Sequence, residues 1–145
     1  MDDVVIIGGG IIGAATAYFL SKEGRKVKVI ERDPTYKSAS FPLSLGGFRR
    51  QFYQKENILL GKFARDFIFQ IPELLKTKKN PNPTASMVPN GYLLMFGPDD
   101  AEEQYRALEN HKECDAGTKN IKGTELNKLF PYINNEGIET ATYTD

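Results

Sequence analysis

VVIIGGGIIGAATAYFL, residues 4–20, is the most apolar stretch of this chain. A membrane anchor and a secretory signal are the first alternatives to examine. The stretch is at the short limit for a bilayer span and contains four glycines, which disfavours an anchor. A signal peptide needs a basic segment before its apolar core, and Asp2 and Asp3 stand there instead. Neither membrane insertion nor secretion accounts for the pattern.

A nucleotide-binding turn accounts for it better. Residues 4–7 are β-branched and apolar, as in a strand buried on both faces. Gly8, Gly10 and Gly13 then have the spacing G-x-G-x-x-G: a tight turn, close approach of the backbone to a pyrophosphate, and close packing of helix on strand. A helix-favouring segment follows, and Gly24 is placed to end it. The order strand, glycine turn, helix predicts a dinucleotide site.

A second predicted strand, residues 26–30, closes with Glu31. This acid stands close to where such a βαβ unit places the carboxylate that accepts a hydrogen bond from a ribose hydroxyl. A Gly-rich connector without a ligand is the alternative, but it gives no reason for the position of the acid. We therefore predict an α/β fold with a Rossmann-like βαβ unit and a parallel sheet.

The composition excludes several classes of function. The chain has 145 residues and a formal net charge of zero, so nothing indicates binding to nucleic acid or to an acidic membrane surface. Its one cysteine, Cys114, excludes an internal disulfide framework, and its one histidine, His111, argues against Ser-His-Asp chemistry and histidine metal clusters. Both residues are predicted at the surface of a charged helix. No metal site is expected.

Residues 32–47 are small, polar and rich in glycine, so we predict a loop. It is either a surface connector or a segment that lies along a bound cofactor, and its length favours the second alternative. Arg49 and Arg50 follow directly. Two adjacent cations are usually solvated, but these two stand beside the predicted cofactor loop.

The remaining chain predicts alternating helices and strands. A long helix is expected over 56–76, with an apolar face that packs in the core and a kink or break at Pro72. Residues 78–83 form a linker. We predict a β-hairpin over 86–96, a helix from a capping box of Asp99 and Glu102 to residue 112, and a short helix over 124–129. The last residues, ETATYTD, show no closing element, so the chain is expected to be a fragment. The predicted domains are 1–77, the N-terminal part of a dinucleotide-binding domain, and 78–145, the start of an incomplete α+β domain.

The segment DDVVIIGGGIIGAATAYFLSKEGRKVKVIERD resembles the N-terminal unit of the D-amino-acid-oxidase-like family of FAD-dependent oxidoreductases. Five later blocks extend the resemblance over the whole chain: ERDPTYKSAS, SLGGFRRQF, ENILLGKFARDFI, PNGYLLMF and LNKLFPYINNEGI. They resemble a mitochondrial branch of the family that is associated with assembly of respiratory complex I. The resemblance implies a flavoenzyme that acts on a small amine or amino acid, a mitochondrial location, and complex I assembly intermediates as partners. It also implies that 1–77 is the N-terminal part of a FAD-binding domain and that 78–145 is the start of the substrate domain.

The same resemblance implies roles for individual residues. Those expected along FAD, from pyrophosphate and adenosine to flavin, are Gly8, Gly9, Gly10, Ile12, Gly13, Glu31, Arg32, Ser38, Ala39, Ser40, Gly46 and Gly47. Arg49 and Arg50 are expected near the isoalloxazine, where a cation stabilises negative charge on the reduced ring or orients a substrate carboxylate. No catalytic residue can be named beyond these two candidates.

The sequence also departs from the family. Members with covalent FAD attach it to histidine or cysteine, and SLGGFRRQF contains neither, so FAD is expected to be non-covalent in this segment. Family members are much longer, and the 145-residue chain alone is expected to be inactive. Two other functions stay open: a complex I assembly factor with a structural flavin, and an NAD-dependent dehydrogenase. The loop SASFPLSLGGFRRQF disfavours the second, because NAD domains normally continue with another βα unit there.

Overall fold

The computed structural model describes residues 3–145. The chain forms two compact units, Met1–Gly47 and Phe48–Asp145, and each is described by itself. This division falls before the predicted domain boundary between residues 77 and 78. The assignment of 1–77 and 78–145 to a FAD-binding and a substrate domain stays a prediction.

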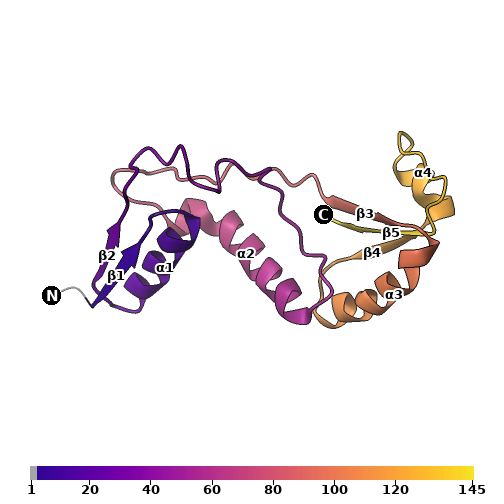
Figure 1. Cartoon of the computed structure of the whole chain (residues 1–145), viewed down its shortest axis with the longest axis horizontal. Coiled ribbons are helices and arrows are strands. Elements are labelled where there is room, and N and C mark those ends of the chain that lie inside the picture. The colour runs from indigo at the N-terminus through magenta and orange to yellow at the C-terminus, as the bar shows by residue number, and fades with distance from the viewer. Residues whose placement is uncertain (1–2) are drawn as a thin grey trace. The chain divides into compact units, whose positions relative to one another are not determined.

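The first unit is the predicted βαβ unit. Strand β1 (Val4–Ile7) is followed by helix α1 (Ile11–Lys22) and strand β2 (Val27–Ile30). The strands pair in parallel, with Val4 opposite Val27, and Figure 1 shows α1 beside them. The β-branched residues of both strands favour this extended, paired backbone. The predicted parallel α/β unit is confirmed.

Helix α1 ends where the sequence predicts. The amide of Gly24 donates to the carbonyl of Ser21 at 3.0 Å, and the amide of Arg25 donates to that of Leu20 at 3.1 Å. These bonds satisfy carbonyl groups that the last helical turn leaves without partners. The chain therefore turns sharply from α1 into β2.

The second unit is built on a sheet of three antiparallel strands. They are β3 (Tyr92–Phe96), β4 (Lys119–Lys122) and β5 (Thr140–Thr144), in the order β3-β5-β4. Figure 1 shows β5 between the other two. Each strand pair is antiparallel, and Ala141 faces Met95 on one side and Ile121 on the other.

This sheet corrects two predictions. The expected hairpin over 86–96 is wrong, because residues 86–88 form no strand and β3 pairs with β5 instead. Ser86 has φ +52°, which is incompatible with an extended strand. The C-terminal residues, in which no closing element was expected, supply the central strand. Their alternation of threonine with alanine and tyrosine suits a strand that is covered on both faces.

Two long helices belong to the second unit. Helix α2 (Lys55–Leu74) runs through Pro72 without interruption and ends shortly after it. Helix α3 (Pro98–Glu113) follows the N-cap residue Gly97 and has proline in its first turn. No side chain caps its N-terminus, so the predicted capping box of Asp99 and Glu102 is wrong. The predicted short helix corresponds to η1 (Gly123–Glu125) and α4 (Leu126–Leu129).

The second unit has two small apolar clusters. One joins Ile121, Leu126 and Ala141, so it packs the sheet against α4. The other joins Ile58 of α2 with Cys114 and Ala116, just beyond α3. Helix α2 is covered only in part within this unit: Ile58 is fully buried, whereas Phe63 is 55% exposed and stacks on Phe67.

The prediction that His111 and Cys114 lie at the surface is wrong. Both are buried, with 3% and 8% of their surface exposed. The imidazole Nε2 of His111 lies 2.8 Å from the carbonyl oxygen of Phe52. The packing of α3 against residues before α2 decides this burial. The charged composition of α3 describes only its opposite face.

Candidate cofactor-binding site

The glycine turn after β1 has the geometry that its spacing predicts. Gly8 has φ +97°, in the left-handed region that favours glycine, and its amide donates to the carbonyl of Ile30 at 2.8 Å. At Gly13, an added Cβ would lie 1.9 Å from the carbonyl oxygen of Gly8. Only glycine at position 13 lets the first helical turn of α1 lie so close to the loop that follows β1.

The N-terminus of α1 is left open by its own sequence. Gly10 is the N-cap residue, no side chain caps the helix, and its first turn carries no acid. The amide groups there and the positive end of the helix dipole therefore favour an anion. An added Cβ on Gly10 would meet no atom within 4 Å. This space and these donors fit a pyrophosphate.

Glu31 lies against the glycine turn. Its Oε2 accepts a hydrogen bond from the Gly9 amide at 2.6 Å, and its Oε1 accepts one from the Asp33 amide at 2.9 Å. The bond from Asp33 and then that from Gly9 hold the pKa of the Glu31 carboxyl below its ordinary value. The carboxylate therefore stays ionised and retains lone pairs that can accept from a hydroxyl.

The loop after β2 begins with a tight turn. Asp33 Oδ1 accepts hydrogen bonds from the amide and the hydroxyl of Thr35, at 2.9 and 2.6 Å. These bonds, the hydroxyl first, lower the pKa of the Asp33 carboxyl. The Tyr36 amide closes the turn on the Asp33 carbonyl at 3.1 Å. Tyr36 itself has φ +56°, a conformation that is uncommon for a residue with a bulky side chain.

The later loop residues lie at the surface of the first unit. Ser38, Ser40, Gly46 and Gly47 are exposed, and Ala39 is half-buried. The Ala39 amide donates to the Tyr36 carbonyl at 3.1 Å. The predicted loop is confirmed as a segment without helix or strand. Its contact with a cofactor, like that of Arg32, Ile12 and the three spaced glycines, stays a prediction.

Tyr36 is a residue of this site that the sequence analysis missed. An added Cβ on Gly9 would lie 2.8 Å from the Tyr36 hydroxyl oxygen. The phenol ring of Tyr36 therefore reaches back across the turn to the glycine loop. The tight turn at Asp33 was the available sequence signal, since it decides where the next side chain points.

Arg49 and Arg50 belong to the second unit and are described with their neighbours there. The Arg49 guanidinium lies over the Phe52 ring, 4.9 Å from its centroid, and Arg49 is exposed. Arg50 Nη2 donates to the carbonyl of Asp145 at 2.5 Å. Burial, and then the nearby Arg65, lower the pKa of the Arg50 guanidinium from its ordinary value. Arg49 is therefore the cation that is freer to meet a ligand.

The residues after this pair are fixed by contacts with the same unit. Gln51 is 2% exposed, and its Nε2 donates to the Tyr92 carbonyl at 2.7 Å. Asn110 Nδ2 donates to the Tyr53 carbonyl at 2.8 Å. On the other side, an added Cβ on Gly61 would lie 3.2 Å from the Arg49 carbonyl oxygen. The arginine pair is thus held by β3, α3 and α2.

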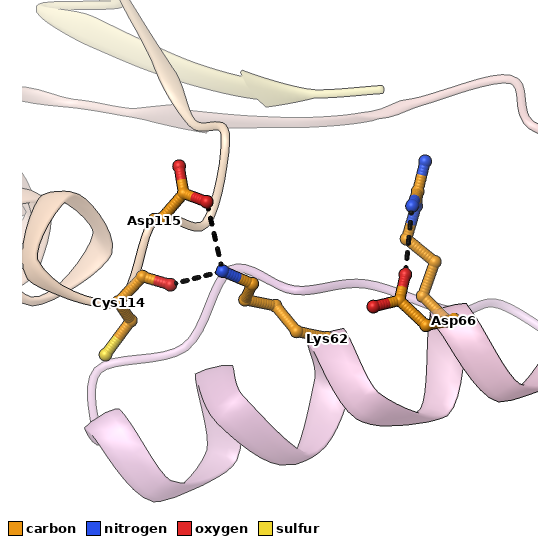
Figure 2. A network of polar contacts seen from close by, with 5 residues as sticks. Lys62, Asp66, Cys114 and Asp115 are labelled. Carbon is orange, nitrogen blue, oxygen red and sulfur yellow. Dashed lines mark hydrogen bonds and ion pairs between the residues drawn. The ribbon is translucent and has the colours of Figure 1, made fainter.

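Lys62 joins α2 to the end of α3. Its Nζ donates to the Cys114 carbonyl at 2.7 Å and pairs with Asp115 Oδ2 at 3.3 Å (Figure 2). Asp115 has φ +49°, an uncommon backbone conformation for a residue with a side chain. The separate pair of Arg65 with Asp66 is exposed. The Lys62 contacts are structural, because they join α2 to the end of α3.

Residues 3–145 contain no group of three histidine, cysteine, aspartate or glutamate side chains that could hold a metal ion. Within the same range, no helix is both long and apolar enough to cross a bilayer.

Comparison with known proteins agrees with the resemblance of the sequence. A family model described as FAD dependent oxidoreductase matches residues 3–145. The FAD-dependent oxidoreductase domain-containing protein 1 of Xenopus laevis is 40% identical over 149 aligned residues, which cover 97% of this chain and 29% of that protein. This is the protein that the five later blocks of the resemblance point to. The chain spans less than a third of this relative.

Two solved structures share the fold. The L-proline dehydrogenase from P. horikoshii has a TM-score of 0.77 and 24% identity, over 99% of this chain and 36% of that one. The glycine oxidase from Bacillus cereus ATCC 14579 has a TM-score of 0.69 and 24% identity, over 99% of this chain and 39% of that one. At this identity the likeness concerns the fold alone.

Proposed function

The chain belongs to the FAD-dependent oxidoreductase family, and from that premise we propose that its protein oxidises an amine or an amino acid. Bound FAD would supply the chemistry by accepting a hydride from the substrate α-carbon. The observation that carries the proposal is the family match over residues 3–145, together with an open, uncapped helix N-terminus at Gly10.

The first unit would hold the dinucleotide. The pyrophosphate would lie at the N-terminus of α1, beside Gly10, where amide donors and space are both present. Glu31 would accept a hydrogen bond from the adenosine ribose while it keeps its bond from Gly9. No histidine or cysteine stands in SLGGFRRQF, which supports non-covalent binding in this segment.

Arg49 would act near the reacting groups. Its guanidinium is exposed and rests on Phe52, so it can turn towards an anion without breaking an ion pair. A substrate carboxylate or negative charge on the reduced flavin would be such an anion. Arg50, bonded to the Asp145 carbonyl, would hold the segment rather than bind substrate.

The test is anaerobic flavin reduction in a family-length protein that contains this chain. Proline and glycine come first, because the two solved structures of the same fold are named for them; secondary and tertiary amines follow. We expect one of these compounds to bleach the flavin absorbance. A flavin that dithionite reduces but that stays oxidised with every amine tested would refute the proposal.

An assembly factor for respiratory complex I, located in mitochondria and carrying a structural flavin, is the alternative. The resemblance of the later blocks to the mitochondrial branch, and the 40% identity to the Xenopus laevis relative, support it. It predicts no reduction of the flavin by amines, together with co-purification of complex I assembly intermediates. Variants that lose FAD would then lose the partners as well.

A further inference from the structure

Tyr36 lies where the glycine loop would meet the cofactor. Its hydroxyl oxygen is 2.8 Å and its Cε1 is 3.5 Å from the position that a Cβ on Gly9 would take. Gly9 is not one of the three spaced glycines of the turn. A Cβ there would nevertheless displace the phenol, which is the far end of a flexible side chain.

The backbone directs Tyr36 to this place. Tyr36 has a left-handed φ of +56°, and it directly follows a turn that is fixed by hydrogen bonds between Asp33 and Thr35. The Tyr36 amide and carbonyl are both bonded, to Asp33 and to Ala39. The unusual conformation is thus held from both sides, and the ring crosses back to the loop between β1 and α1.

A phosphate beside Gly9 would need a hydrogen-bond donor other than the Gly9 amide. The Gly9 amide already donates to Glu31 at 2.6 Å, so it is not available to a phosphate. Tyr36 is 40% exposed, and its phenol can donate a hydrogen bond. Its hydroxyl stands beside the loop whose neighbouring residue, Gly10, has open space in front of it.

We propose that Tyr36 is a cofactor-binding residue whose hydroxyl donates a hydrogen bond to the pyrophosphate of FAD. The proposal rests on FAD binding by this unit, as set out above. It adds to the glycine turn a donor that replaces the Gly9 amide. Gly9 then serves the site indirectly, by leaving room for the phenol.

The first experiment measures affinities of the apoprotein of a family-length protein that contains this chain. Tyr36→Phe should raise the Kd of FAD and of ADP about tenfold, as expected for one hydrogen bond to a charged group. The Kd of riboflavin, which has no pyrophosphate, should not change. Tyr18→Phe, which removes a phenol from α1 of the same unit, is the matched control and should leave all three affinities unchanged.

The second experiment moves Tyr36 without removing it. The Cβ of Gly9→Ala should push the flexible phenol aside, so FAD should bind about as weakly as in Tyr36→Phe while thermal unfolding of the apoprotein stays unchanged. In a Tyr36→Ala background, Gly9→Ala should have no further effect on the Kd.

Equal FAD affinity of Tyr36→Phe and the wild type would overturn the proposal and leave the function untouched. Equal losses of riboflavin and ADP affinity would also overturn it, since they would indicate a general structural role. A wild-type protein that binds FAD but is not reduced by amines would remove the proposed function and leave Tyr36 as a binding residue.

Discussion

Adding a side chain at Gly13 should reduce the stability of the fold, whereas adding one at Gly10 should reduce FAD binding. At Gly13, a Cβ would lie 1.9 Å from the Gly8 carbonyl oxygen, whereas contacts under 3.0 Å are essentially never seen. The helix and the turn must therefore separate by about 1 Å (3.0 − 1.9). Overpacking of this kind destabilises by roughly 1–3 kcal/mol. Gly13→Ala should lower the midpoint of unfolding of the apoprotein.

At Gly10 we expect little change in stability but a large loss of FAD binding. An added Cβ meets nothing within 4 Å, and φ −62° and ψ −176° are allowed for any residue. Gly10→Val should change stability by less than about 1 kcal/mol. It should nevertheless fill the space of the pyrophosphate. Losing two charge-assisted hydrogen bonds, at about 1.5 kcal/mol each, weakens FAD binding more than about 100-fold.

The assay compares both variants in a family-length protein that contains this chain. Flavin content after purification and the Kd of FAD report the site, and far-UV circular dichroism of the apoprotein during heating reports the fold. Gly10→Val should keep its unfolding midpoint and lose flavin. Normal flavin retention in Gly10→Val would refute the assignment of the glycine turn. Unchanged unfolding of Gly13→Ala would refute the packing argument.

Three further predictions concern charged and buried groups. Glu31→Gln should weaken FAD binding less than Gly10→Val does. Because the pKa of the Glu31 carboxyl is lowered in the folded protein, the wild type should lose stability as the pH falls from 4.5, the ordinary pKa of this group, through the folded pKa. A Glu31→Gln variant that loses stability over the same acid range would contradict this. Burial lowers the pKa of His111, so stability should decrease as pH falls below about 6.5, and His111→Phe should flatten that slope in urea titrations at several pH values. Replacing Arg49 and Arg50 by alanine should change the visible flavin spectrum or the reduction potential without unfolding the protein; unchanged values would return the pair to a solvated surface role.

The parts that sequence alone predicts are those decided by neighbours along the chain. The βαβ unit is one of them, because its strand, turn and helix signals lie within residues 4–31 and support one another. The position of Glu31 beside Gly9 follows from the same unit. Gly8 has the left-handed φ, and Gly13 the close approach to the Gly8 carbonyl, that their spacing predicts.

The parts that were wrong depend on segments far apart in the chain. Nothing local shows that β3 takes β5 as its partner, and the turn at residues 89–91 favoured a nearby strand. His111 and Cys114 were assigned from the charge of α3, but contacts with Phe52 and Ile58 decide their burial. Tyr36 was missed because its φ value, not its residue type, directs it to Gly9.

The strand order β3-β5-β4 also has a consequence for co-translational folding on the ribosome. Strands β1 and β2 and helix α1 are all present once residue 30 has left the exit tunnel, so they can pair and pack early. Strand β3 has to wait until residues 140–144 emerge, with the entropy of closing a long loop still to be overcome. During that interval its apolar residues are open to chaperones. We expect nascent chains stalled before residue 140 to protect β2 from proteolysis but not β3.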